Sequence, residues 1–493
     1  MEPDGALYAG IAKYMVQHHD YLNLFADGHD WLDKPHFPFW MIAVSFNLFG
    51  FTTFAYKLPA FLFVMMGVIY TYQFARSLYD EKVALWAVCI LLSAEHLVIS
   101  STDVRAEHYL MGLIIASVYH LHRKHLVPGA LFAACAVMTK GPFALIPIGC
   151  AIAGQYVFTK QWKELFHWRW LVVAVLIGVF ILPELYALYE QFDKHPEKVV
   201  FGQTNVSGIR FFFWDSQFGR FMNTGPIKGQ GDPFFFFHTV LWAFLPWSVF
   251  LYAAVFSRRK KEFYCISGAL ATFALFSFSS FQLPHYLNII FPFFAIITAQ
   301  YILSLKKPKF FRITLHVIMS LIAVAIVGLW VLYQPAINYF TVVLLLVITG
   351  LVIWIRDVFY RMCLASIALN VFLNGMFYPD VLQYQSGSSA AFYANRELKG
   401  QPVGLYRWNS YALNYYLDAP LERYDSIPAA QPVLIFTAGN QKDSLVLKGY
   451  TCKVIQAFPH FPVTKLDLPF VNHYTRRSAI EERFLVLVSG RSE

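Results

Sequence analysis

The sequence predicts a mainly α-helical, polytopic membrane protein that ends in a small α/β domain. Of its 493 residues, 57% are hydrophobic, 18% aromatic and 14% charged, whereas about a quarter of the residues of a soluble protein are charged. Apolar runs near the roughly 20 residues that a bilayer crossing needs recur between residues 56 and 379. From about residue 381 the composition changes to short strand-like and helix-like runs. We therefore expect a transmembrane domain over 1–380 and a soluble domain over 381–493.

Twelve apolar runs define the expected transmembrane helices. They cover residues 56–77, 84–100, 105–121, 128–139, 142–158, 170–190, 233–256, 263–280, 285–304, 312–333, 337–356 and 361–379. The run 128–139 is short for a crossing, and one bent hairpin across 128–158 is the alternative. Ahead of these runs, PDGALYAGIAKYM and DKPHFPFWMIAVSFNLFG predict two interfacial helices in a first loop over residues 1–55.

The distribution of Lys and Arg predicts the orientation. Basic residues gather in alternate loops, which the positive-inside rule assigns to the cytoplasm; these are Arg76, Lys82, Arg123, Lys124, Lys160, Lys163, Arg169, Arg258 to Lys261, Lys306, Lys307, Lys309, Arg312, Arg356 and Arg361. The net charge of +9 is explained by these loops, and we expect no nucleic-acid binding. The first 55 residues and the tail are then outside, so we expect one more helix ahead of Met1. The six cysteines are expected to be free thiols.

The tail alternates two kinds of run. PVGLYRW, PVLIFTAG, CKVIQAF and RFLVLVSG predict strands, and SSAAFYANREL and NSYALNYYL predict helices.

Ionisable residues gather in the outward loops and at outward helix ends. They are Asp4, Asp33, Lys34, Asp103, Arg105, Glu107, Lys140, Asp215, Arg220 and His285. Such a grouping favours a site that handles a charged group at the lipid–water boundary, because a transporter more often places its charges near the membrane midplane. Several of these residues, taken alone, also have a structural explanation. Asp4 could cap a helix, Lys34 could snorkel, Lys140 could cap helix carbonyls and Arg105 could pair with Glu107.

Several motifs, taken in order, resemble the GT-C class of polytopic glycosyltransferases, with the closest likeness to aminoarabinose (lipid A) transferases and protein O-mannosyltransferases. The motifs are PD-x3-YA-x-I-A from Pro3, the acid-Lys-Pro of Asp33 to Pro35, FG at Phe49, the pair Arg105 and Glu107, MTKG from Met138 to Gly141, GRF from Gly219, LPW from Leu245 and LPHY from Leu283 to Tyr286. They cover roughly residues 1 to 300. The chain departs from the family at Asp4-Gly5, at Leu7, at Asp33 and at WDSQ, where a His-ligated metal is in doubt.

The resemblance implies that a sugar is transferred, with inversion, from a polyprenyl-phosphate donor to a lipid, glycan or protein acceptor outside the cytoplasmic (inner) membrane. Cations beside the phosphate would stabilise the departing charge, and a carboxylate would remove the acceptor proton. The expected catalytic residues are Asp4, Asp33 and Glu107, and the expected substrate-binding residues are Tyr8, Lys34, Arg105, Lys140, Arg220 and His285. The resemblance implies no definite cofactor, and a divalent metal ion with Asp33 or Asp215 as ligands is the alternative.

Two other functions remain open from the sequence. A transporter or flippase for a lipid-linked or anionic substrate fits the number of apolar runs, and Glu95 and Glu184 lie inside such runs. A non-catalytic relative that only binds polyprenyl lipid is the second alternative, and the Asp4-Gly5 departure supports it.

Overall fold

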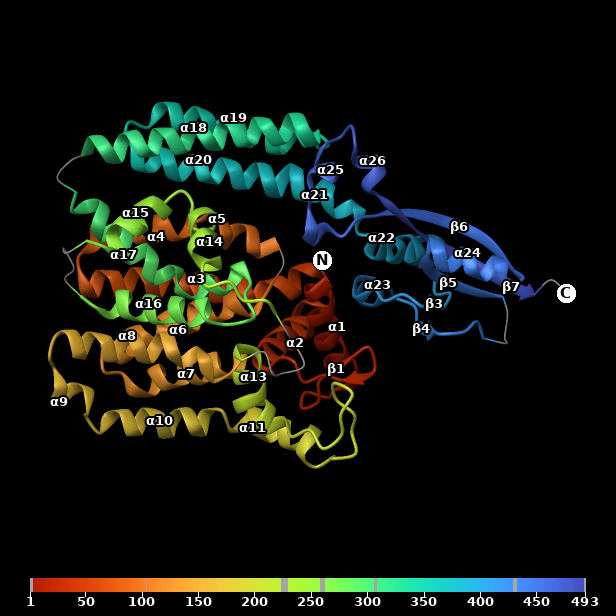
Figure 1. The fold of residues 1–493 in the computed structure, drawn as a ribbon, viewed down its shortest axis with the longest axis horizontal. Coiled ribbons are helices and arrows are strands. Elements are labelled where there is room, and N and C mark those ends of the chain that lie inside the picture. The colour runs from red at the N-terminus through yellow and green to blue at the C-terminus, as the bar shows by residue number, and fades with distance from the viewer. Residues whose placement is uncertain are drawn as a thin grey trace. The chain divides into compact units, whose positions relative to one another are not determined.

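The structure is a computed structural model that describes residues 3–102, 104–222, 229–257, 262–305, 308–428 and 432–491. Helices dominate it, and one five-stranded sheet lies near the C-terminus (Figure 1). The chain divides into two units. The helical unit comprises Ile11–Ser320 and Leu351–Ile367, and the C-terminal unit comprises Met1–Gly10, Leu321–Gly350 and Ala368–Glu493. A mainly helical fold with a small C-terminal sheet is therefore confirmed.

The helical unit is built from short and long apolar helices. They are α2 (Phe37–Phe49), α3 (Thr53–Leu78), α4 (Glu81–Leu92), α5 (Glu95–Ile99), α6 (Ala106–His122), α7 (Leu126–Lys140), α8 (Leu145–Phe158), α9 (Trp162–Leu165), α10 (Arg169–Phe180), α11 (Leu182–Leu188), α12 (Gly208–Arg210), α13 (Phe218–Phe221), α14 (Phe235–Ala243), α15 (Ser248–Val255), α16 (Tyr264–Ser277) and α17 (Phe291–Leu303). α6 packs between α3 and α7, and α8 packs against α16. A two-residue hairpin, β1 (Phe25–Ala26) and β2 (His29–Asp30), precedes α2.

Each of the twelve apolar runs is helical, but several runs contain a break. The run 84–100 is divided between α4 and α5, and the run 233–256 between α14 and α15. Within the described residues, four helices are long and apolar enough to cross a membrane: Thr53–Leu78, Pro284–Leu303, Lys309–Tyr333 and Val358–Tyr384. Trp162–Phe180 and Leu182–Asp193 form a fifth if their pair, bent by 41°, is one span. A membrane protein is supported, while twelve crossings stay a prediction.

The turn MTKG joins α7 to α8 through a single glycine. α7 ends at Lys140. Gly141 follows with φ 96°, a positive value that residues with a side chain rarely adopt. Pro142 then begins a short 3-10 helix, Pro142–Ala144, which leads into α8. The sequence therefore places Lys140 at the end of a helix, next to a sharp reversal of the chain.

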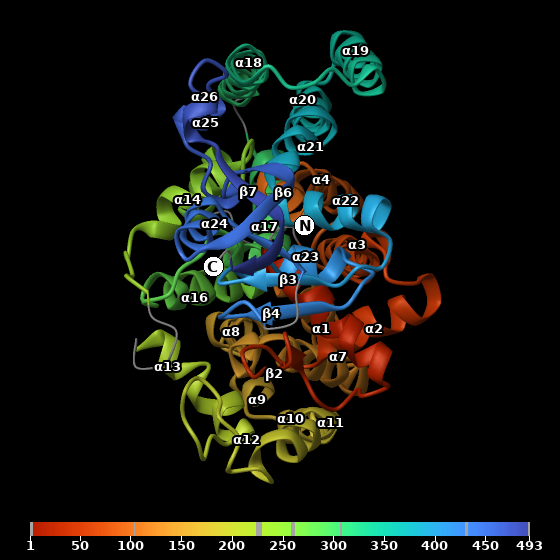
Figure 2. The ribbon, with the colours of Figure 1, turned by 90° about the vertical axis from the view of Figure 1, so that its right-hand side faces the viewer.

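The C-terminal unit carries the sheet and the helices α22 (Ser386–Tyr393), α23 (Tyr411–Tyr416) and α24 (Gly439–Leu447). The strands β3 (Val403–Tyr406), β4 (Leu421–Tyr424), β5 (Val433–Ala438), β6 (Tyr450–His460) and β7 (Glu481–Arg491) lie in the order β4-β3-β5-β7-β6. β3 is parallel to β4 and β5, and β7 is antiparallel to β5 and β6. Figure 2 looks toward these strands.

Both faces of this sheet are covered. On one face, residues of α22 and α23 pack with Leu405, Phe436 and Leu485. On the other face, Leu445 of α24 packs with Ile435 and Val486. The alternation of these buried residues along β5 and β7 follows the two-residue period of a strand, and it explains why apolar runs here form a two-sided sheet rather than further spans.

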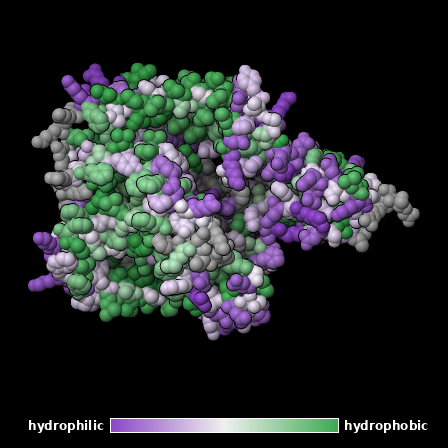
Figure 3. Space-filling view, viewed as in Figure 1, coloured by the Kyte–Doolittle hydropathy of each residue, from purple (hydrophilic) through white to green (hydrophobic). Residues whose placement is uncertain are grey.

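Four further helices contribute residues to both units: α1 (Pro3–His18), α18 (Pro308–Tyr333), α19 (Tyr339–Trp354) and α20 (Val358–Phe372). The C-terminal unit also contains the short helices α21 (Tyr378–Val381), α25 (Leu468–Val471) and α26 (Arg476–Ala479). In Figure 3 the surface over the helices is largely hydrophobic, and the surface over the C-terminal strands is largely hydrophilic. An apolar surface on a helical unit is what contact with lipid requires.

Candidate functional site

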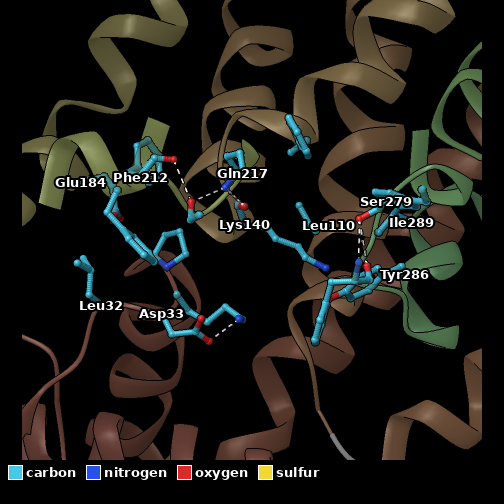
Figure 4. A pocket seen from close by; sticks show the side chains of 18 of the residues that line it. Leu32, Asp33, Leu110, Lys140, Glu184, Phe212, Gln217, Ser279, Tyr286 and Ile289 are labelled. Carbon is cyan, nitrogen blue, oxygen red and sulfur yellow. Dashed lines mark hydrogen bonds and ion pairs between the residues drawn. The ribbon is translucent and has the colours of Figure 1, made fainter. Parts of the chain in front are cut away.

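A cavity in the helical unit brings together residues from six distant segments. Its empty space is about 960 Å³, solvent at its mouth included. The charged lining residues are Asp33, Lys34, Lys140 and Glu184. Much of the remaining wall is aromatic and comprises Phe143, Phe211, Phe212, Phe276, Phe281 and Tyr286. Figure 4 shows Lys140 directed into this space, with Asp33 on the other side. An apolar pocket with a few convergent charges is a typical binding site.

One lysine enters the cavity from the loop ahead of α2. The Lys34 ammonium lies 2.6 Å from the Asp33 carboxylate, and the two side chains are 18% and 13% exposed. Pro35 follows, so the residue before it favours an extended backbone, and the chain then turns into α2. The acid-Lys-Pro motif therefore places a largely sheltered ion pair at the cavity wall.

The second lysine enters from the turn between α7 and α8. The ammonium of Lys140 contacts the carboxylate of Glu107, which lies in the first turn of α6. The Nε2 atom of His285 is 4.0 Å from the same carboxylate. The Lys140 Nζ atom lies 3.6 Å from the centroid of the Tyr286 ring, a cation–π geometry. MTKG, LPHY and Glu107 are thus brought together in the structure.

Gln217 completes this side of the cavity. Its Nε2 atom donates to the backbone carbonyl of Lys140 at 3.1 Å and to the hydroxyl of Ser216 at 2.7 Å. A Cβ atom on Gly141 would overlap this amide. The residue at position 141 is therefore required to be glycine both by its conformation and by the close approach of Gln217. In the sequence, WDSQ was considered only as the place of a missing histidine, so the role of Gln217 was not predicted.

Glu184 lines the cavity, and both of its carboxylate oxygens are hydrogen-bonded to His36. The carboxylate accepts from the backbone N–H of His36 and lies 3.0 Å from its Nδ1 atom, and both side chains are 0% exposed. In the sequence, Glu184 stands out only as a charge inside an apolar run, and His36 has no predicted role. The acid inside an apolar run was the available signal, but nothing in the sequence connects it to a residue 148 positions earlier.

The other predicted site residues that the structure describes are not among those that line the cavity. Arg105 precedes α6 as its N-cap residue, and Asp215, 38% exposed, lies 3.6 Å from Arg210. Asp4 and Tyr8 lie on α1 in the residues assigned to the C-terminal unit, with Asp4 in the first helical turn. The side chain of Arg220 and all of Asp103 lie outside the described residues. The functional roles of all these residues stay predictions.

No group of three or more His, Cys, Asp and Glu side chains close enough to hold a metal ion occurs among the residues that the structure describes. Asp33 is bonded to Lys34, and Asp215 lies 3.6 Å from Arg210. The possible divalent ion therefore has no preformed protein cage in this part of the chain.

Comparisons with known proteins give a consistent result. A family model described as dolichyl-phosphate-mannose-protein mannosyltransferase matches residues 33–186. A protein of Aquifex aeolicus (strain VF5) is 24% identical over 399 residues, which cover 78% of this chain and 75% of that protein. The undecaprenyl phosphate-alpha-4-amino-4-deoxy-L-arabinose arabinosyl transferase of Pseudomonas aeruginosa (strain PAO1) is 26% identical over 307 residues, which cover 58% of this chain and 52% of the enzyme. The aligned region thus spans about half of that relative.

Among solved structures, ArnT from Cupriavidus metallidurans bound to undecaprenyl phosphate is similar with a TM-score of 0.76 and 18% identity, and the match covers 99% of this chain and 93% of that protein. At this identity the likeness concerns the fold, and it extends over both units. The resemblance drawn from the motifs is confirmed: the chain is similar in sequence to the mannosyltransferase family model and to an aminoarabinose transferase, and similar in fold to ArnT.

Proposed function

We propose that this protein is an inverting integral membrane glycosyltransferase, which moves a hexosyl or pentosyl group from a polyprenyl-phosphate donor to a lipid, glycan or protein acceptor. The observation that carries the proposal is the cavity of the helical unit. Its wall is rich in aromatic and apolar residues, yet two lysines, Lys34 and Lys140, reach it from segments more than a hundred residues apart. The names of the relatives, which include a polyprenyl-phosphate-dependent sugar transferase, support the same substrate class.

The chemistry of the donor explains why two cations are useful. A polyprenyl-phosphate sugar is a phosphodiester with one negative charge, and the departing polyprenyl phosphate develops a second charge as the sugar–oxygen bond breaks. Ammonium groups fixed beside these oxygens stabilise the transition state more than the bound donor. In this proposal Lys34 and Lys140 bind the phosphate, with Arg105, Arg220, His285 and Tyr8 as further candidate contacts.

The carboxylates divide into two roles. Asp33 and Glu107 orient Lys34 and Lys140 through the contacts described above. Asp4 is proposed as the general base that removes the proton of an acceptor hydroxyl. If a divalent ion takes part, Asp33 is its proposed ligand, because Mg²⁺ in proteins is commonly held by one or two carboxylates together with substrate phosphates.

The number and the orientation of the membrane crossings are also part of the proposal. We propose twelve crossings within 1–380, basic loops in the cytoplasm, and the cavity and the domain 381–493 outside the inner membrane. The transporter alternative gains no support from its two intramembrane acids. Glu184 is bonded to His36, and Glu95 accepts from the hydroxyl of Ser366 at 2.7 Å.

The test is transfer of a radiolabelled sugar from polyprenyl phosphate by the purified full-length protein. Lys34→Ala and Lys140→Ala should each lower transfer by roughly 100-fold or more, the scale of removing one transition-state donor. Lys442→Ala is the matched control, since Lys442 pairs with Asp443 at 3.3 Å, is 23% exposed and does not line the cavity. Equal transfer by Lys34→Ala and the wild type would contradict the proposal. Substrate movement across vesicles without transfer would favour a transporter, and lipid binding without transfer would favour a non-catalytic relative.

A further inference from the structure

The loop that carries Asp33 and Lys34 is attached to the segment that follows α10 by buried polar side chains. Glu184 of α11 bonds the backbone N–H and the Nδ1 atom of His36, each at 3.0 Å. Gln191, seven residues further on, accepts from the N–H of Leu24 and donates to the carbonyl of Leu24, each at 2.9 Å. Glu184, His36 and Gln191 are each 0% exposed. Two fully buried side chains therefore hold both ends of the loop.

The hydrogen bonds of His36 require one proton between its ring and the Glu184 carboxylate. Its Nε2 atom lies 3.0 Å from the carbonyl oxygen of Leu22. A carbonyl oxygen only accepts, so Nε2 carries a hydrogen. The contact between Nδ1 and the Glu184 carboxylate then needs one further proton, whichever of the two groups carries it. Every polar atom of the His36 ring and both oxygens of Glu184 are used in this arrangement.

The pair is directly connected to a proposed phosphate contact. His36 is two residues after Lys34, with only Pro35 between them, and Glu184 and Lys34 both line the cavity. The proline limits rotation of the backbone on its N-terminal side. A fixed His36 therefore restricts where the Lys34 ammonium can lie. The same restriction would be lost if the imidazole or the carboxylate were removed.

We propose that Glu184 and His36 form a positioning pair, which fixes the Asp33–Lys34 segment so that the Lys34 ammonium is held in the cavity for a phosphate. This inference rests on the proposed function. Neither residue touches the reacting atoms; both act through Lys34. Holding the cation in place before the lipid binds reduces the ordering cost of binding.

The test measures binding of undecaprenyl phosphate to the purified full-length protein in nanodiscs. His36→Phe keeps the ring volume and the backbone bond to Glu184 but removes both ring contacts, and we expect it to weaken binding about tenfold, which corresponds to 1.4 kcal/mol. Glu184→Leu should weaken binding by at least as much, and Glu184→Gln should recover most of that loss, because an amide can accept from the backbone N–H and donate to a neutral imidazole. Lys194→Ala, which removes the surface pair with Glu190 and the cation–π contact with Tyr189 and leaves Glu184 and His36 untouched, is the control.

A double-mutant cycle distinguishes positioning from a general structural role. A residue that acts through Lys34 has no further effect once Lys34 is gone, so His36→Phe should leave the affinity of Lys34→Ala unchanged. An equal loss from His36→Phe in both backgrounds, or unchanged binding by His36→Phe alone, would overturn the inference. If the wild type does not bind the lipid, or Lys34→Ala binds as tightly, it is the proposed function that fails. Thermal unfolding of each variant shows that it is folded, and His36→Phe decides the matter if Glu184→Leu does not fold.

Discussion

The contact between Lys140 and Glu107 is asymmetric, because Glu107 is 3% exposed and Lys140 is 24% exposed. Loss of the lysine would leave an unpaired carboxylate in a buried place, whereas loss of the carboxylate would leave a lysine that still reaches water and the Tyr286 ring. We therefore expect Lys140→Met to destabilise the protein by about 3 kcal/mol, and Glu107→Gln by less. Thermal unfolding of the purified variants measures the difference. A larger loss from Glu107→Gln would contradict it.

The glycine after Lys140 provides a second prediction. At Gly141, alanine would be placed at φ 96° and ψ −179°, a backbone conformation found essentially only for glycine, which costs roughly 1–3 kcal/mol, and it would push away the Gln217 amide. Gly141→Ala should therefore lower the unfolding temperature and displace Lys140, reducing transfer. Gly149→Ala in α8 is the matched control, since nothing lies within 4 Å of its added Cβ atom and alanine favours a helix. Similar behaviour of the two variants would show that the turn tolerates a side chain.

The C-terminal unit should lose stability in mild acid through His460. Burial, with a smaller contribution from Arg483, lowers the pKa of His460 from 6.5 to about 4, and its Nδ1 atom bonds the Ser386 hydroxyl at 2.9 Å. As the pH falls below 6.5, the unfolded chain binds a proton at this residue before the folded chain does. Stability contributed by the neutral ring is thus complete above pH 6.5, falls as the pH approaches 4 and changes little below it. Thermal unfolding between pH 4 and 7 should show this slope, and His460→Gln should flatten it.

The proposed orientation can be tested by chemical labelling. In a background without the six native cysteines, Glu197→Cys should react with a membrane-impermeant maleimide in intact cells, and Lys160→Cys should react only after the cells are opened. The reason is that residues 191–232 are poor in clustered basic residues compared with the loop that carries Lys160 and Lys163. The reverse pattern would invert the topology and place the cavity's loops in the cytoplasm.

Apolar runs predicted where helices lie, because burial or lipid contact of a whole helix requires a continuous apolar sequence. Breaks inside the runs were not predicted. Residues 93 and 94 separate α4 from α5, and the hydroxyl of Ser93 accepts from the Trp247 Nε1–H at 2.9 Å. The partner at this break is 154 residues away in the sequence, so local patterns do not reveal it. In the C-terminal domain the four predicted strands are present, but β4 and α24, with their polar and less periodic sequences, were missed.

The residues of the candidate site were predicted from the sequence, but their contacts with one another were not. Asp33, Lys34, Glu107 and Lys140 were identified from their place in outward loops and from motifs, and the structure brings them to one cavity or its edge. Their pairing was not foreseen: the sequence suggested a local contact of Arg105 with Glu107, whereas the structure pairs Glu107 with Lys140. Side-chain contacts between distant segments follow from packing, which local patterns do not encode.

The last feature concerns the border strands of the C-terminal sheet. Among the described residues β6 pairs with β7 and with no other strand, so one edge of this eleven-residue strand has no strand neighbour there. Two register shifts, at Tyr450/Thr451 and Val454/Gln456, bend this strand, and it ends in Pro459 and His460. β4, on the opposite border, is only four residues long and exposes Glu422 and Arg423. Bulges, proline, brevity and charge discourage edge-to-edge aggregation, so neighbouring copies crowded in one membrane can keep their sheets separate.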